Sequence, residues 1–145
     1  MKKLIYLDII TKERGANMIV LSVNAGSSSL KFQAFDMPEE NVLISGTFER
    51  IGMKESFYTI KVNGEKIKNE VELKNHERAF EILMQELLEN NIVKKLDEIK
   101  AIGHRIAHGG SYFNKTEEMT EENIKKVKEL YSGMETLIFL SSKIA

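Results

Sequence analysis

The chain places Asn24-Ala25-Gly26-Ser27-Ser28-Ser29-Leu30-Lys31 between two apolar runs. The run before this segment, residues 19–23, is typical of a buried strand, and the run after it, residues 30–35, alternates apolar and polar side chains as a second strand does. Glycine lets a backbone approach an anion closely, hydroxyl and backbone N–H groups donate hydrogen bonds, and a lysine supplies positive charge. The segment therefore predicts a tight turn between two strands that is suited to hold a phosphate.

The residues alone leave two interpretations of this turn open. Glycine and serine also satisfy the geometry of an ordinary hairpin turn. The phosphate loop in which Gly-Lys-Ser/Thr opens a helix is absent, because a strand follows here. Phosphate binding is favoured by Asn24 at the end of the first strand and by Lys31, which alternation places on the face opposite Leu30 and Phe32. Lys31 can then point toward a cleft while its neighbours pack inward.

A second motif, Gly103-His104-Arg105-Ile106-Ala107-His108-Gly109-Gly110, follows a short strand predicted over residues 99–103. One interpretation is a zinc site, but two histidines four residues apart align only on a helix, the flanking glycines oppose a helix, and no third ligand of the usual type lies nearby. A second interpretation is a polar strand end followed by a glycine turn. A third places Arg105 at a cleft, where its planar guanidinium can bind a carboxylate with two hydrogen bonds.

The remaining pattern predicts a mixed α/β domain rather than a regular doubly wound sheet. We expect strands over residues 18–24, 29–36, 42–51, 57–62, 65–73 and 99–103. Asn63-Gly64 predicts a type I′ hairpin turn between two of them. The only proline, Pro38, stands in a turn.

Two helices are expected in the second half of the chain. Asn75 is a good N-cap residue, and a helix over residues 76–90 is predicted by apolar side chains at helical spacing: Phe80, Leu83, Met84, Leu87 and Leu88. His76 is expected to be an exposed residue in the first turn of this helix. Thr120 caps the second predicted helix, which Gly133 ends, with Ile124, Val127 and Tyr131 on its apolar side.

Composition excludes several classes of protein. The 145 residues are 42% hydrophobic, which is enough for one domain with a core. Lysine and arginine number 21 against 22 acidic residues, so no basic excess favours a nucleic acid or an anionic membrane as partner. No run approaches the ~20 apolar residues that span a bilayer. Cysteine is absent, which excludes disulfides and thiolate zinc sites and fits a cytoplasmic location.

Residues 1–17 are interpreted as an N-terminal appendage. The opening Met1-Lys2-Lys3 and the apolar residues after it resemble the start of a signal peptide, but Asp8 interrupts the apolar stretch and no convincing cleavage site follows. Met18 stands directly before the first clear strand. We therefore expect Met18 to be the natural start of the protein.

Both motifs resemble the signatures of acetate kinases. Residues 23–31 are similar to the first signature and residues 103–110 to the second, in the same order and at about the same separation. Ala25 and Ser28 favour the acetate or propionate type over the butyrate type. The resemblance covers residues 18–130 and implies an α/β fold, namely an incomplete mixed-sheet N-terminal domain of the actin- and hexokinase-like ATPase fold.

The resemblance also implies a reaction and a set of site residues. The reaction is the transfer of a phosphoryl group from ATP to acetate, giving ADP and acetyl phosphate, with Mg²⁺. Asn24 matches the asparagine of the family's magnesium site, and Arg105 matches the arginine that holds the substrate carboxylate. The phosphate turn would comprise Gly26, Ser27, Ser29 and Lys31, with Lys31 contacting ATP. Family members are usually homodimers.

The resemblance ends near residue 130. Acetate kinases continue with Leu-Ala-Pro-Leu-His-Asn-Pro, whereas residues 131–145 contain neither proline nor histidine. We expect this to be a divergent tail that arose by a frameshift or a premature stop. The family's catalytic residues, including a catalytic aspartate and later histidines, are missing, so the chain should have little kinase activity alone. The alternatives are a non-catalytic module that binds nucleotides or phosphate, and a structural fragment without a ligand.

Overall fold

A computed structural model describes residues 3–5, 18–106 and 120–130 of the chain. In chain order its elements are β1 (Lys3–Ile5), β2 (Met18–Ala25), β3 (Ser29–Met37), β4 (Asn41–Glu49), β5 (Phe57–Val62), β6 (Glu65–Glu70), α1 (His76–Glu89), the 3₁₀ turn η1 (Leu96–Glu98), β7 (Ile99–Ile106) and α2 (Glu121–Leu130). The predictions for residues 1–2, 6–17, 107–119 and 131–145, including His108, Tyr131 and Gly133, lie outside the described residues.

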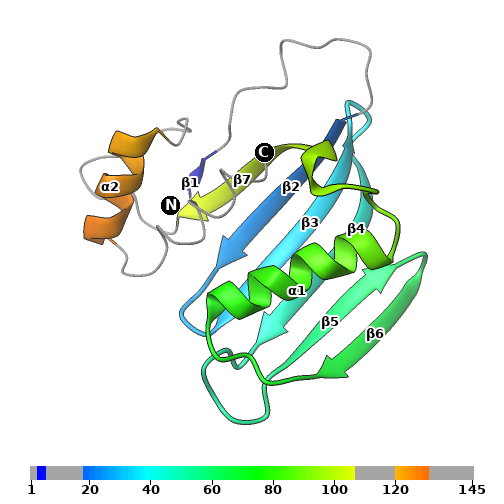
Figure 1. Cartoon of the computed structure of the whole chain (residues 1–145), viewed down its shortest axis with the longest axis horizontal. Helices are drawn as coiled ribbons and strands as arrows, with labels where there is room; N and C mark the ends of the chain where they lie inside the picture. The colour runs from blue at the N-terminus through cyan, green and yellow to red at the C-terminus, as the bar shows by residue number, and fades with distance from the viewer. Residues whose placement is uncertain (1–2, 6–17, 107–119, 131–145) are drawn as a thin grey trace.

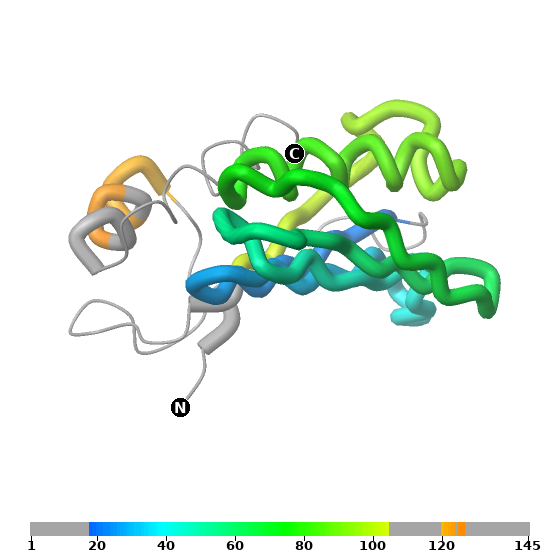
Figure 2. Tube along the Cα trace, turned by 90° about the horizontal axis from the view of Figure 1, so that it is seen from below, coloured from blue at the N-terminus to red at the C-terminus, as the bar shows by residue number. Residues whose placement is uncertain are grey.

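The strands form one seven-stranded sheet in the order β1-β7-β2-β3-β4-β5-β6 (Figure 1). Neighbouring strands are antiparallel except β2 and β7, which are parallel. Helix α1 lies on one side of the sheet as a second layer (Figure 2). The predicted mixed α/β architecture is confirmed.

Alternation along the strands decides which side chains meet α1. In β3, Leu30, Phe32 and Ala34 are buried, whereas Lys31 and Gln33 are exposed on the opposite face. The buried set joins β4, β5 and α1 in one core. Apolar burial of this kind contributes about 25 cal/mol per Å² and is the main force that holds helix and sheet together.

Tyr58 links β5 to α1 through a polar contact at the edge of this core. Its hydroxyl donates a hydrogen bond of 2.7 Å to Oε1 of Glu86. Burial of the phenol, together with this hydrogen bond and the negative charge of Glu86, raises the pKa of Tyr58 well above its ordinary value. The hydroxyl is therefore a stable donor at neutral pH.

The hairpin of β5 and β6 forms as predicted. Asn63 and Gly64 both have positive φ, 53° and 77°, as a type I′ turn requires. The second strand ends at Glu70 and not at residue 73 as predicted, because the chain then turns toward Ser56. The Ser56 hydroxyl donates to the Val71 carbonyl and accepts from the Leu73 N–H, at 2.7 and 2.8 Å.

Helix α1 begins and ends close to the predicted residues. The Asn75 side chain accepts a hydrogen bond of 2.9 Å from the Arg78 N–H, which confirms the N-cap. The prediction that Leu88 joins the apolar face is wrong, since Leu88 is 37% exposed. Eight residues of helix rotate a side chain about 80° away from that of Phe80, which moves Leu88 off the buried stripe.

Two later elements also follow from local signals. Strand β7 extends to Ile106, beyond the predicted end at residue 103, because it pairs with β2 on one side and β1 on the other. Thr120 caps α2 as predicted, with its hydroxyl accepting from the Asn123 N–H at 3.2 Å. No helix in residues 3–5, 18–106 and 120–130 is long and apolar enough to cross a membrane.

Candidate functional site

The predicted phosphate turn is the connection between β2 and β3. Gly26 N–H donates to the Ser29 carbonyl at 2.9 Å, which closes the turn. Ile51 N–H donates to the Ser28 carbonyl at 2.9 Å and attaches the turn to the residues that follow β4. The turn is therefore fixed by one hydrogen bond within it and by one to Ile51. Gly26 and Ser27 are exposed.

Gly26 leaves space for the Ser29 side chain. A Cβ atom at this position would lie 2.7 Å from the Ser29 hydroxyl oxygen, closer than real Cβ contacts come. The glycine thus lets the Ser29 hydroxyl approach the backbone of the turn. The approach of this backbone to an anion, which the sequence predicts for the glycine, stays a prediction.

Three of the predicted binding residues lie level with one another on adjacent strands. Asn24 of β2 is paired with Lys31 of β3 on one side and with Arg105 of β7 on the other. Neighbouring strands are about 4.8 Å apart, so the backbones of Lys31 and Arg105 are separated by about 10 Å. Strands far apart in sequence thus bring the two predicted ligand-binding positions to one end of the sheet.

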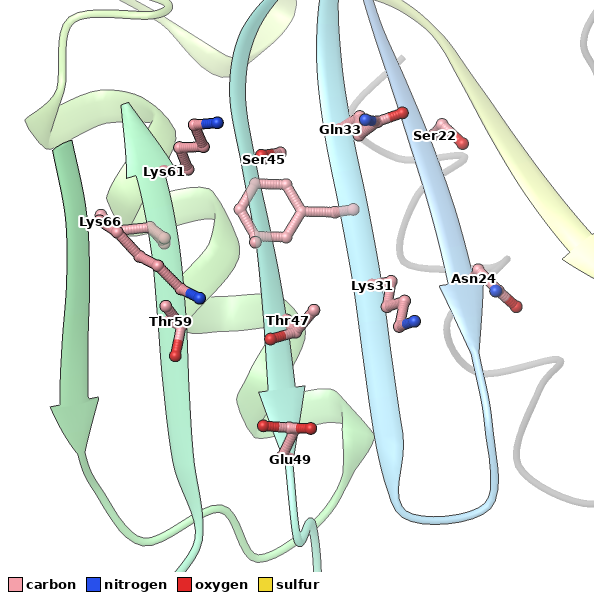
Figure 3. A pocket seen from close by; sticks show the side chains of 13 residues that line it. Ser22, Asn24, Lys31, Gln33, Ser45, Thr47, Glu49, Thr59, Lys61 and Lys66 are labelled. Atoms are coloured by element: carbon pink, nitrogen blue, oxygen red, sulfur yellow. The ribbon is translucent and has the colours of Figure 1, made fainter. Parts of the chain in front are cut away.

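Asn24 and Lys31 line a groove of about 890 Å³ on the sheet face opposite α1 (Figure 3). Its wall continues across β4 and β5 through polar side chains, with Thr47 paired to Lys31 and Thr59 paired to Thr47. The charged residues of the lining are three lysines and one glutamate: Lys31, Lys61, Lys66 and Glu49. The groove is therefore positively charged. Gly26, Ser27 and Ser29 lie in the turn and do not line it.

His76 contacts the turn directly. Its Nε2 lies 2.7 Å from the Gly26 carbonyl oxygen and 3.1 Å from the Ser29 carbonyl oxygen. The prediction that His76 is simply an exposed residue is wrong, because the ring is half-buried against this turn. Sequence spacing carried no sign of the contact, since Gly26 and His76 are 50 residues apart.

His104 belongs to the core. It lies beside Val23 in the parallel register and the residue is 3% exposed. Burial lowers the pKa of His104 to about 4. The ring is therefore neutral at pH 7. No group of three histidine, aspartate or glutamate side chains suited to a metal ion occurs in the part of the chain that the structure describes.

Asn24 has the chemistry expected of a single protein ligand to Mg²⁺. Magnesium prefers oxygen ligands, and in phosphate sites it binds one or two protein oxygens and completes its shell with phosphate oxygens and water. Asn24 is half-buried, lines the groove and is paired with Lys31. Its amide oxygen can therefore serve as one ligand of an ion that a bound phosphate would bring.

The mixed sheet that this hairpin opens, with α1 packed on one face, matches solved structures of acetate and propionate kinases and so has the actin- and hexokinase-like ATPase fold. The model of the Acetokinase family matches residues 19–134. The chain belongs to the Acetokinase family.

Curated relatives and solved structures agree with this assignment. The chain is 46% identical over 111 residues to the acetate kinase of Anoxybacillus flavithermus and 49% identical over 111 residues to that of Bacillus cereus, which covers 77% of this chain and 28% of each relative. The crystal structure of Porphyromonas gingivalis acetate kinase matches with a TM-score of 0.72 and 38% identity, over 77% of this chain and 29% of that chain.

A propionate kinase from Francisella tularensis matches with a TM-score of 0.68 and 35% identity, over 77% of this chain and 28% of that chain. The resemblance and fold class predicted from the two motifs are thus confirmed. The chain spans less than a third of the length of the relatives that it matches.

Proposed function

We propose that this chain forms the phosphate-binding part of an ATP–acetate phosphotransferase, which converts ATP and acetate into ADP and acetyl phosphate in the cytoplasm with Mg²⁺. The observation that carries the proposal is the register of Arg105, Asn24 and Lys31 on three adjacent strands. A carboxylate bound at Arg105 and a phosphate bound at Lys31 would then lie on either side of Asn24.

Each residue has a role that suits its chemistry. Gly26, Ser27 and Ser29 supply close backbone approach and hydrogen-bond donors to phosphate oxygens, and Lys31 supplies charge. Asn24 supplies a neutral oxygen to Mg²⁺. Arg105 supplies a planar pair of donors to the acetate carboxylate. Phosphoryl transfer depends chiefly on positioning and charge neutralisation, which is what this set provides.

The 145 residues by themselves should bind ligands without turnover. Loss of one arginine that neutralises transition-state charge slows phosphoryl transfer by ~10³-fold or more, and the resemblance places such a residue beyond this sequence. The second candidate function is therefore a non-catalytic module that binds nucleotides or phosphate. It is favoured by the proposed phosphate-contacting residues, all of which lie within the described part of the chain.

Calorimetric titration of the chain with MgADP and MgATP tests the phosphate role. Replacing Lys31 by Met removes a charged hydrogen-bond donor, so we expect affinity to fall by about tenfold to a hundredfold. Lys100→Met is the matched control, because Lys100 lies at the end of β7 opposite Arg105, away from the proposed site. There its Nζ donates to the Asp97 carbonyl. Absence of binding by the wild-type chain, or equal losses in both variants, would contradict the proposal.

Acetate separates the two candidate functions. We expect the carbon resonance of ¹³C-acetate to shift in the presence of the chain and MgADP. Arg105→Lys should abolish this shift, because lysine keeps the charge but lacks the bidentate geometry. The affinity of this variant for MgADP should stay within about twofold of the wild-type value. A chain that binds MgADP but never acetate would support the non-catalytic module.

A further inference from the structure

We propose that His76 is a positioning residue for the phosphate turn. Its imidazole fixes the carbonyl groups of Gly26 and Ser29 toward α1, and thereby directs the Ser27 N–H toward the side where a phosphate binds. The link to ligand affinity rests on the proposed function of the turn, whereas the link to the shape of the turn does not.

The argument starts from the planar peptide unit. Nε2 of His76 lies 2.7 Å from the Gly26 carbonyl oxygen. In a trans peptide the carbonyl and the following N–H point in opposite directions, so a Gly26 carbonyl that faces the imidazole sets the Ser27 N–H to face away from it. Ser27 is one of the residues proposed to contact phosphate, and its backbone N–H is thus aimed before any ligand arrives.

The Ser29 carbonyl is held by two donors at once. It accepts from Gly26 N–H at 2.9 Å and lies 3.1 Å from Nε2 of His76. A carbonyl oxygen has two lone pairs, and these two donors occupy both. The Ser28 carbonyl accepts from Ile51 N–H. The carbonyls of Gly26, Ser28 and Ser29 therefore all have hydrogen-bond partners within the protein. The conformation of the turn is therefore set in the free chain.

The imidazole stands on a rigid support. His76 is the first residue of α1, and the Asn75 cap and the burial of Ala79 and Phe80 fix that end of the helix on the sheet. Preorganisation of a binding loop improves affinity because less conformational freedom is lost on binding. Because His76 stands on this fixed end of α1, its ring holds the turn in one position relative to the helix.

The geometry requires hydrogen on Nε2. Two carbonyl oxygens face this nitrogen, so it must donate, either as the neutral Nε2–H tautomer or as the imidazolium. The neutral Nδ1–H tautomer would place a lone pair against both oxygens. Long-range ¹H–¹⁵N spectra of the ligand-free chain should therefore show a protonated Nε2 on His76, and the Nδ1–H tautomer would overturn the proposal.

Three variants separate positioning from general stability. His76→Ala removes the donor, His76→Gln restores an N–H donor, and Glu77→Gln alters the adjacent exposed residue as the control. We expect His76→Ala to weaken MgADP binding by about tenfold, the glutamine variant by no more than about threefold, and the control by less than about twofold. Equal affinity of the alanine variant and the wild type, or equal losses with Ala and Gln, would overturn the proposal.

Hydrogen exchange of the Gly26 amide in the free chain provides a readout that needs no ligand. We expect its exchange to be about tenfold faster in His76→Ala than in wild type or His76→Gln, because that amide closes the turn. If wild type fails to bind MgADP while this exchange pattern appears, the proposed function is wrong and the action of His76 on the turn stands. Unchanged Gly26 exchange would reject that action itself.

Discussion

Single residues set the geometry of the phosphate turn. Gly26 leaves room for the Ser29 hydroxyl, and His76 and Ile51 donate to the carbonyls around it. None of these contacts strengthens the core greatly, but together they decide where the donors of the turn point. Substitutions here should alter ligand binding more than stability.

Gly26→Ala tests that statement. The added methyl would displace the Ser29 hydroxyl, a group that can rotate away, so we expect a loss of stability below about 1 kcal/mol. MgADP affinity should nevertheless fall by about fivefold, since a neutral hydrogen bond is worth about 1 kcal/mol. Gly64→Ala is the control, because Gly64 has a φ of 77° and no atom near its missing Cβ. It should lose about 1 kcal/mol of stability from backbone strain and no affinity. Similar affinity of Gly26→Ala and wild type would contradict the prediction.

At the scale of elements, β4 approaches its neighbours closely at one residue. A Cβ on Gly46 would lie 2.5 Å from Cε1 of Phe32 and 2.7 Å from the backbone oxygen of Thr59. The Phe32 ring occupies the space that a side chain at position 46 would fill. The Thr59 carbonyl belongs to the adjacent strand, β5. The fit between β3, β4 and β5 therefore depends on this glycine.

Gly46→Ala should destabilise the chain by about 1–3 kcal/mol, because overpacking a fixed backbone forces the strands apart. Urea denaturation followed by circular dichroism measures the change. Ser45→Ala is the matched control on the adjacent, half-buried residue of the same strand. Equal midpoints for Gly46→Ala and the control would show that the sheet can adjust without cost.

At the scale of the whole molecule, His104 couples folding to pH. Burial lowers its pKa from 6.5 to about 4 in the folded chain. Below pH 6.5 the His104 ring is protonated in the unfolded chain but stays neutral in the folded chain. The folded state therefore has its full stability above pH 6.5 and loses it as the pH falls toward 4. Since a tenfold difference in proton affinity is worth about 1.4 kcal/mol, the unfolding free energy should fall by about 3 kcal/mol over this range.

Denaturation at several pH values, with His104→Gln beside the wild type, checks this prediction. The variant lacks the titrating ring, so its stability should fall less steeply between pH 6.5 and pH 4. Parallel pH profiles of the two proteins would show that His104 is not responsible for the loss of stability.

Local features of the sequence were sufficient to predict most of the elements, although not β1, which lies within the predicted appendage. The hairpin around residues 26–28, the Asn63-Gly64 turn and the Asn75 cap depend on a few adjacent residues, and each formed as predicted. The error at residues 71–73 arose at the end of a strand, where contacts with Ser56 override the pattern. The error at Leu88 arose because helix geometry places this position off the buried stripe. The two motifs were also sufficient to indicate the Acetokinase family, since signatures are read directly from residue order.

Only the tertiary structure decided how distant segments meet. The parallel pairing of β7 with β2 puts Arg105 level with Asn24, although more than half of the chain lies between them. The contact of His76 with the turn, the Gly46 packing and the burial of His104 likewise join residues that no periodicity relates. Side-chain alternation predicts which face a residue occupies, but register between strands is set by the packing of the whole sheet against α1.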